Sequence, residues 1–397
     1  MIPKELKGIP GLMTGPELAV LTRMARSAGS AVELGCFHGR SLAAMGLEHP
    51  GMRLWGVDAW GDMSHRGYQG ATLEACRANL ERLGVRAELL QGKTEEVAPE
   101  FGETVELVHV DAGHSYEECT RDLADWTPKV GPGGALCVHD YGEPHNPALS
   151  RPEVREAVDD WRNSDWAEVE RDGVMIAFRR LIADRGALYV AYGERAREQC
   201  LESIDSLHAV APALPVAVVS DAPLEGADHM IIHPEADRGA RAQKTRMYSL
   251  SPFRETLFLD ADTRVLVDPE PGFGLLRYAD VVLSQDPVRV FSQQTWPHLD
   301  RREVAATRQE TNGGELLYWN SGVILFRRSE RARALFQAWH AEWTRWGKHD
   351  QMALMRAVYR NPVRMVAVRE PWNTHKRKEA KFVFHDHRAA RREGAPQ

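Results

Sequence analysis

The chain has 397 residues, of which 43% are hydrophobic and 27% charged, and this composition excludes a disordered or fibrous protein. Its length predicts two domains. Acidic residues outnumber Lys and Arg by 57 to 50, so the net charge is -7. A protein that binds nucleic acid by neutralising phosphates would carry a basic excess, and we therefore disfavour a nucleic-acid partner.

The first residues and the cysteines indicate a cytoplasmic protein. Residues 1–21 mix Lys, Glu and Pro and lack the basic, apolar and small-residue order of a signal peptide. No apolar run approaches the ~20 residues that a membrane-spanning helix needs. The five cysteines form no CxxC pair, which is typical of reduced, intracellular thiols. We expect no membrane span, and homo-oligomerisation stays open.

Short β-rich runs alternate with helical patterns in the first half, which predicts a parallel sheet covered by helices. A helix is expected over 71–83. The expected strands are 30–34, 53–58, 87–91, 107–111, 135–139 and 174–179. A short mixed stretch, 180–186, follows and ends in Asp-Arg-Gly. We place the boundary there, with one domain over 1–184 and the other over 185–397.

The second half shows the same α/β alternation. A helix is expected over 194–209. The expected strands are 187–191, 215–220, 229–233, 256–260, 280–284 and 321–326. Both domains are therefore predicted to be α/β, each with strand ends that can hold a ligand.

A glycine-containing turn follows the first expected strand. The segment from Glu33 to Gly39 places Gly35 and Gly39 where the backbone must turn tightly before a helix. About 25 residues later Asp58 ends the second strand, where a carboxylate can accept both hydroxyls of a ribose. An ordinary turn with a solvated Asp would give the same pattern, so these residues alone leave both interpretations open.

Polar residues also follow the fourth and fifth expected strands. Asp111 ends the fourth strand and His139 and Asp140 end the fifth, so all three should meet in one crevice. Together they could bind a divalent cation such as Mg²⁺. His114 lies in the adjoining loop as a candidate base. The alternatives are a surface histidine and helix-capping aspartates.

These segments give residues 28–180 a resemblance to the class I S-adenosylmethionine-dependent methyltransferases, especially the macrocin-type O-methyltransferases. The resemblance rests on residues 32–35 with 39–41, 57–62, 91–95, 111–117 and 139–141. It implies a Rossmann-like fold and S-adenosylmethionine as cofactor. It further implies roles for individual residues: Glu33, Gly35 and Gly39 around the methionine part, Asp58 on the ribose, Thr94 near the adenine, and Mg²⁺ at Asp111, His139 and Asp140.

Methyl transfer needs an acceptor hydroxyl that is held in line with the donor and loses its proton. The catalytic candidates are Asp111, as a ligand of a metal that would lower the pKa of the acceptor, and His114, which could take the proton. Relatives commonly present two carboxylates where this chain has His139-Asp140, so the third ligand and the dependence on metal stay open.

The second half contains an apolar strand, Leu257 to Leu259, that ends in Asp260-Ala-Asp262. Two carboxylates at a strand end can hold Mn²⁺ or Mg²⁺, which would bridge a diphosphate. A D-x-D triplet is common by chance, so an acidic turn is the alternative.

Further motifs precede and follow this triplet: a helical segment with Lys244, the run Tyr318-Trp-Asn320-Ser-Gly322, His349-Asp350-Gln351, and His385 with His387. Their order gives residues 187–388 a resemblance to nucleotide-sugar transferases of the GT-A fold, especially the glycogenin-like (family 8-like) group. The resemblance implies a metal at Asp260, Asp262 and His385, or less favourably His387. It implies that Lys244 faces the diphosphate and that Asn320, Asp350 and Gln351 contact donor or acceptor sugar. Asp350 is also a candidate nucleophile.

The two resemblances predict a bifunctional enzyme, an O-methyltransferase and a metal-dependent glycosyltransferase acting on one small-molecule or glycan acceptor. Fusion would hold two modifications at high effective concentration. The alternative is one active transferase domain whose other half only binds the substrate.

Overall fold

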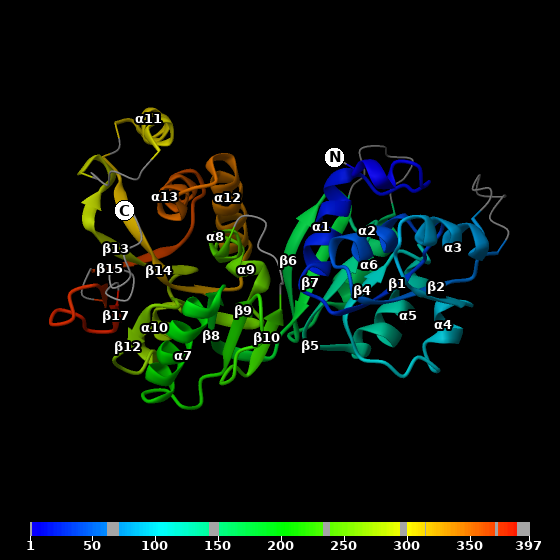
Figure 1. Ribbon diagram of the computed structural model, residues 1–397, viewed down its shortest axis with the longest axis horizontal. Helices are drawn as coiled ribbons and strands as arrows, with labels where there is room; N and C mark the ends of the chain where they lie inside the picture. Colours follow the sequence, from blue (N-terminus) through cyan, green and yellow to red (C-terminus); the bar gives the residue numbers. More distant parts are fainter. Residues whose placement is uncertain are drawn as a thin grey trace. The chain divides into compact units, whose positions relative to one another are not determined.

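The computed structural model describes residues 2–61, 71–142, 151–232, 239–293, 300–313, 315–369 and 372–386. They form two compact units, Met1–Ile182 and Ala183–Gln397 (Figure 1). Asp62 and His387, which the sequence singled out, lie outside the described residues. None of the described helices is both long and apolar enough to cross a membrane.

The N-terminal unit is built on a seven-stranded sheet with the order β3-β2-β1-β4-β5-β7-β6. The strands are β1 (Ser30–Leu34), β2 (Arg53–Asp58), β3 (Glu88–Gln91), β4 (Val105–Val110), β5 (Val130–Val138), β6 (Trp166–Asp172) and β7 (Met175–Arg180). The first five strands are parallel, whereas β7 is antiparallel to both β5 and β6. The expectation of a parallel sheet is therefore wrong for β7, which is reversed because β6 and β7 join as a hairpin rather than through a crossover helix. The sequence analysis did not expect β6.

Helices cover both faces of this sheet (Figure 1). They are α1 (Gly15–Ala25), α2 (Arg40–Glu48), α3 (Leu73–Arg82), α4 (Thr94–Val97), α5 (Tyr116–Trp126) and α6 (Pro152–Trp161). Side chains of α1, α2 and α3 pack with Ala31 and Leu107 on one face. Side chains of α5 and α6 pack with Val32 and Val108 on the other. Successive strand residues thus serve opposite cores, and the polar residues at the strand ends lie outside both.

The C-terminal unit has a second seven-stranded sheet, ordered β10-β9-β8-β11-β14-β13-β15. Its strands are β8 (Ala183–Ala191), β9 (Val216–Ser220), β10 (His229–Ile232), β11 (Phe253–Asp260), β13 (Val281–Val290), β14 (Leu317–Arg327) and β15 (Met365–Val368). The run from β10 to β11 is parallel, but β14 is antiparallel to both β11 and β13. Here too the parallel expectation fails around one strand, while the α/β class is confirmed.

A small three-stranded sheet extends this unit: β12 (Thr263–Val265), β17 (Val383–His385) and β16 (Asn373–Thr374). The register pairs Thr263 with His385, and Asp386 N donates to Asp262 O at 2.8 Å. This pairing places His385 next to the end of β11, although more than a hundred residues separate the two in the sequence. His385 therefore lies beside the D-x-D triplet.

The helices of the C-terminal unit are α7 (Glu194–His208), α8 (Ala240–Lys244), α9 (Met247–Leu250), α10 (Glu270–Leu275), α11 (Arg301–Glu310), α12 (Glu330–Trp346) and α13 (Asp350–Arg360). Side chains of α7 pack with Tyr189 and Leu257 on one face of the large sheet. An aromatic cluster joins α9 and α12 to β14, with the rings of Tyr248 and Phe336 stacked 5.7 Å apart and Phe326 beside both. The cores leave the carboxyl end of β11 free for polar side chains.

Candidate functional site

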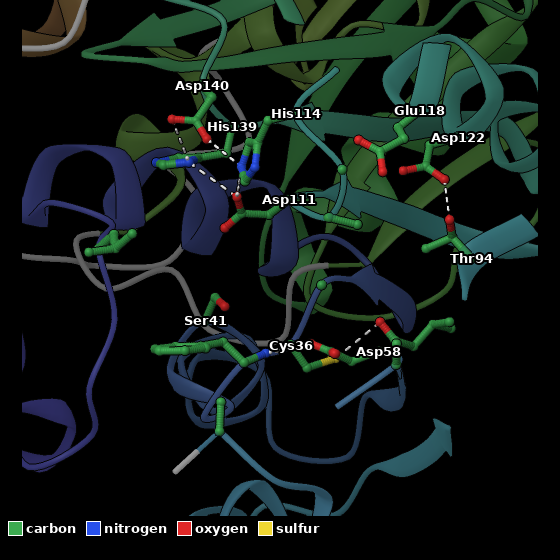
Figure 2. Close-up of a pocket in the computed structure, with 18 of the residues that line it drawn as sticks. Cys36, Ser41, Asp58, Thr94, Asp111, His114, Glu118, Asp122, His139 and Asp140 are labelled. Carbon is green, nitrogen blue, oxygen red and sulfur yellow. Dashed lines mark hydrogen bonds and ion pairs between the residues drawn. The ribbon is translucent and has the colours of Figure 1, made fainter. Parts of the chain in front are cut away.

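The N-terminal unit contains a cavity of about 1020 Å³ at the carboxyl ends of its parallel strands (Figure 2). Most of the methyltransferase residues predicted from the sequence line it: Gly35, Asp58, Thr94, Asp111, His114, His139 and Asp140. Figure 2 shows Asp111, His114, His139 and Asp140 gathered together, with Asp58 and the pair of Thr94 and Asp122 at separate places on the wall. Glu33 and Gly39, which were also predicted, do not line this cavity.

Gly35 is required by the close approach of two backbones. Its φ is +86°, and a Cβ built on it would lie 2.1 Å from the carbonyl oxygen of Asp111. Asp111 N in turn donates to Leu34 O at 2.8 Å, so the ends of β1 and β4 are held against one another. Only glycine fits there. Gly39 has φ +81° and precedes α2, and its nearest neighbour would be Cys76 Sγ, so it serves the turn rather than the cavity wall.

Asp58 is fixed by two backbone donors. Phe37 N donates to Oδ2 at 2.8 Å, and Trp60 N donates to Oδ1 at 2.7 Å. The Trp60 indole donates to Phe37 O at 3.0 Å, which ties the two loops together. Each carboxylate oxygen retains capacity for a further donor, so the arrangement fits a diol such as that of a ribose.

Glu33 takes a place that differs from the one the resemblance implies. It is fully buried, and its Oε1 lies 2.8 Å from Nδ1 of His109, which is also fully buried. Burial raises the pKa of Glu33, although His109 and Ser41 act in the opposite direction. Glu33 therefore links β1 to β4 through His109, away from the cavity wall. The sequence analysis missed His109 because it lies inside a strand and outside every motif.

Asp111, His139 and Asp140 come together as one cluster. Each offers one ligand atom, and these atoms lie within 4.8 Å of one another. His139 Nδ1 is 3.2 Å from Asp111 Oδ1 and 3.4 Å from Asp140 Oδ1. Asp140 has φ +60°, a left-handed conformation, and Tyr141 N donates to Val174 O at 2.9 Å immediately after it. One imidazole and two carboxylates are a donor set that fits a divalent cation.

Glu17 on α1 adds a third carboxylate, which the sequence analysis missed although Thr14 and Glu17 have the spacing of a helix capping box. Its Oε2 lies 3.6 Å from His139 Nε2, and its oxygens accept from Thr14 N and Val174 N. Burial would raise the pKa of Glu17, but His139 and the backbone donors lower it to about 2. Burial would likewise lower the pKa of His139, but Asp111, Asp140 and Glu17 raise it well above its ordinary value.

His114 faces the cluster from the loop before α5. Its Nε2 lies 2.8 Å from Asp140 Oδ2 and 4.0 Å from Asp111 Oδ1, and its side chain is 31% exposed. If Nε2–H donates to Asp140, the remaining ring nitrogen, Nδ1, is the atom that can accept a proton. The loop is anchored by a reciprocal cap at the start of α5, in which Ser115 and Glu118 each accept from the backbone N–H of the other.

Thr94 lines the cavity and donates its hydroxyl to Asp122 Oδ1 of α5. Asp122 is only 3% exposed. Burial raises the pKa of Asp122 to about 6, although Thr94 acts in the opposite direction. The sequence analysis named Thr94 but missed Asp122, which has no signal beyond an acidic residue inside a helix.

This shift predicts a pH dependence of stability. Because folding raises the pKa of Asp122, the folded protein binds more protons than the unfolded chain between about pH 4 and pH 6, and stability falls as the pH rises through that window. Asp122→Asn still accepts from Thr94 and should stabilise the N-terminal unit by about 1–3 kcal/mol above pH 6. Denaturant unfolding at pH 4 and pH 7.5 measures this, with the exposed Asp172→Asn as control. An equal gain at both pH values would contradict it.

In the C-terminal unit, Asp260, Asp262 and His385 form a second cluster, with ligand atoms within 4.8 Å of one another. His385 Nε2 is 3.2 Å from Asp262 Oδ1 and 3.6 Å from Asp260 Oδ2. Burial would lower the pKa of His385, but Asp260 and Asp262 raise it to about 9. A Cβ on Gly322 would lie 2.1 Å from His385 Cε1 and 2.7 Å from Asp260 Oδ2, so glycine leaves the space that the cluster needs. Two carboxylates and an imidazole again fit a divalent cation.

Lys244 connects this cluster to Asp350. Its Nζ is 2.8 Å from Asp260 Oδ1 and 3.1 Å from Asp350 Oδ2, and Ser321 donates its hydroxyl to the same Asp350 oxygen at 2.7 Å. Burial would lower the pKa of Lys244, but the two carboxylates raise it above its ordinary value. A buried ammonium beside the carboxylate cluster is suited to an anionic phosphate.

The remaining predicted residues lie next to these. Gln351 donates to Asp286 Oδ2 at 3.0 Å and to Trp319 O at 3.1 Å. Asn320 Oδ1 accepts from Gly322 N and from Asn373 Nδ2, both at 2.8 Å. Lys244 thus links Asp260 with Asp350, and Asn373 links Asn320 with His385. Gln351 follows Asp350 in the chain, and His387 lies outside the described residues. The sequence analysis missed Ser321, although it lies inside the run from Tyr318 to Gly322. It also missed Asp286 and Asn373, which belong to no motif that it named.

Two family descriptions match the chain. One, described as a methyltransferase domain, matches residues 32–141, and the other, described as a nucleotide-diphospho-sugar transferase, matches residues 255–369. The first range contains the Asp111, His139 and Asp140 cluster. The second contains Asp260 and Asp262, whereas His385 lies beyond it.

Solved structures include similar chains. The O-methyltransferase TomG from Streptomyces achromogenes, involved in tomaymycin synthesis and in complex with SAM, is 19% identical, with 43% of this chain and 81% of that chain covered and a TM-score of 0.32. An O-methyltransferase from Bacillus cereus in complex with SAH is 15% identical, with 45% and 93% covered and a TM-score of 0.34. No curated protein matches the sequence.

Proposed function

The chain is a transferase that combines a methyltransferase domain with a nucleotide-diphospho-sugar transferase domain, and from this premise we propose that it is bifunctional. The N-terminal unit transfers a methyl group from S-adenosylmethionine to a hydroxyl of a sugar or natural product. The C-terminal unit transfers a sugar from a nucleotide diphosphate to the same acceptor molecule. The observation that carries the proposal is that each unit assembles its own carboxylate–histidine cluster from distant parts of its sequence.

In the N-terminal unit, S-adenosylmethionine supplies the methyl group, and the residues that fit it lie along one cavity. Asp58, with both oxygens oriented by backbone donors, binds the ribose hydroxyls. Asp111, His139 and Asp140 are placed to hold a divalent cation that would lower the pKa of an acceptor hydroxyl. His114, held by Asp140 through Nε2, accepts the acceptor proton at Nδ1.

In the C-terminal unit, a divalent cation held by Asp260, Asp262 and His385 would stabilise the charge of the departing nucleoside diphosphate. Lys244 contributes a second positive charge beside it. Asp350 and Gln351 lie where a sugar could be bound, with Asp350 kept ionised because Lys244 and Ser321 lower its pKa despite burial. Because Lys244 contacts both Asp260 and Asp350, the diphosphate and the sugar would be bound next to one another.

The direct test is to incubate the purified chain with each donor in turn and follow donor consumption and binding. We expect S-adenosylmethionine and one nucleotide sugar each to raise the melting temperature, since a ligand that binds only the folded state stabilises it. The sugar nucleotide should require Mn²⁺ or Mg²⁺. Stabilisation by one donor class alone would favour the alternative, in which the other half only binds the substrate.

Asp58→Ala should separate the two activities. Without its carboxylate, two hydrogen bonds between a charged group and the ribose are lost, so the affinity for S-adenosylmethionine should fall by about 100-fold. Calorimetric titration of the full chain measures it, and sugar-nucleotide hydrolysis should remain at the wild-type rate. Asp172→Ala, an exposed carboxylate of the same unit, is the control. Unchanged S-adenosylmethionine affinity would remove Asp58 from the ribose site.

A further inference from the structure

Asn373 stands at the centre of a hydrogen-bonded row behind the C-terminal cluster. Its Nδ2 donates to Asn320 Oδ1 at 2.8 Å, and its Oδ1 lies 3.1 Å from His385 Nδ1. The side chain of Asn373 is fully buried, and that of His385 is 5% exposed. We call Gly322 N–H, Asn320, Asn373 and His385 the amide row.

Each orientation along the amide row follows from the one before it. Gly322 N donates at 2.8 Å to the Asn320 side chain, and because a backbone N–H can only donate, the atom facing it must be oxygen. The same oxygen faces the Asn373 side chain, so Asn373 must present its NH₂ group there. The Asn373 oxygen is then the atom directed at His385.

This oxygen determines how the imidazole can act. An amide oxygen only accepts, so His385 Nδ1 carries a hydrogen and donates it. In the neutral ring the lone pair then resides on Nε2. Nε2 is the nitrogen that lies 3.2 Å from Asp262 and 3.6 Å from Asp260. The missing side chain of Gly322 leaves room for the ring edge, which a Cβ would approach to 2.1 Å.

We propose that Asn373 is a positioning residue that presents His385 Nε2 as the metal-binding atom, and that Asn320 acts through Asn373. The inference rests on the proposed function, because it takes the C-terminal cluster to be a metal site. It also divides the two ends of Asn320: Oδ1 is engaged in the amide row, which leaves Nδ2 as the atom available to a sugar. Partners that orient a metal-binding histidine typically change metal affinity by about 10–100-fold when removed.

The test is a titration of the full-length protein with Mn²⁺ in the absence of any donor, with free Mn²⁺ followed by electron paramagnetic resonance. The difference between wild type and Asp260→Asn defines the C-terminal site. Asn373→Ala should raise its Kd by about 10–100-fold. Asn373→Asp keeps an oxygen acceptor toward Nδ1 but replaces the donor to Asn320 Oδ1 with a second oxygen, so it should recover part of the affinity that Asn373→Ala loses. Asn320→Asp keeps Oδ1 and should bind Mn²⁺ with the wild-type affinity. Because it lacks Nδ2, it should raise the KM for the sugar nucleotide.

Two further readouts separate positioning from simple support of the fold. Electron spin echo modulation from the coordinated imidazole nitrogen should weaken in Asn373→Ala and return in Asn373→Asp. The melting temperature without metal reports folding independently. If Asn373→Ala melts lower but keeps both its Mn²⁺ affinity and the nitrogen signal, its role is structural and the inference is overturned.

Failure of the inference can be distinguished from failure of the proposed function. If His385→Ala and Asp260→Asn both bind Mn²⁺ as the wild type does, the C-terminal cluster is not a metal site and both are overturned. If these two variants lose the site while Asn373→Ala retains it, only the inference fails.

Discussion

Asp260→Asn is expected to reduce sugar transfer by about 1000-fold while methyl transfer stays at the wild-type rate. Asp260 belongs both to the candidate cation site and to the ion pair with Lys244. Both of its oxygens contact Lys244 Nζ, and Oδ2 lies beside His385. The amide removes one negative charge from the cation site and leaves Asp350 as the remaining carboxylate at Lys244. Loss of several kcal/mol of charge stabilisation corresponds to a factor of about 1000.

Initial rates with saturating sugar nucleotide and varied Mn²⁺ measure this effect. Asp268→Asn, an exposed carboxylate of the same unit, is the matched control and should change neither activity. Higher Mn²⁺ should recover part of the lost rate if the defect lies in metal binding. A variant within threefold of wild type would exclude Asp260 from the reaction, and an equal loss of methyl transfer would show a folding defect.

Gly35→Ala should abolish methyl transfer and destabilise the N-terminal unit by about 3 kcal/mol. Two costs combine: the backbone has φ +86°, and the added carbon would lie 2.1 Å from the Asp111 carbonyl oxygen, which is backbone and cannot swing aside. The end of β4 must therefore move away from β1. That movement displaces Asp111 from His139 and shifts the turn that carries Phe37, one of the two donors to Asp58.

Binding of S-adenosylmethionine and the unfolding transition of the N-terminal unit both report this change. Gly102→Ala makes the same substitution in open space, where no atom lies within 4 Å of the added carbon, and should be nearly neutral. Sugar transfer in Gly35→Ala should be unaffected. Wild-type methyl transfer in this variant would show that the junction of β1 and β4 can relax without cost.

The strands that hold the sites could be predicted from the sequence because they are apolar runs ended by polar residues. β1 and β2 match their expected bounds, and β11 ends at Asp260 as expected. The short strands β12, β16 and β17 were missed, since two or three residues carry no periodicity. The direction of β7 and β14 was also missed, because strand direction depends on tertiary connections rather than on local pattern.

The candidate site could be predicted only where its residues belong to compact motifs. Asp111, His139 and Asp140 were named because they follow consecutive buried strands, and their metal role stays a prediction. Glu17, Asp122 and Asn373 were not found, because each is brought in by packing from a distant helix or strand. Glu33 shows the opposite error, since a motif position implied a cavity residue and the side chain is buried against His109 instead. The matched families are broader than the macrocin-type and glycogenin-like groups, which stay predictions.

The left-handed backbone of Asp140 has a consequence for the interpretation of sequence variation. At φ +60°, aspartate, asparagine and glycine are tolerated far better than alanine or β-branched residues. In a saturation library selected only for folding, position 140 should therefore already be restricted to these few residues. Enrichment of aspartate over asparagine under selection for methyl transfer would then measure the value of its negative charge alone, whereas an alanine scan would combine that value with the backbone cost.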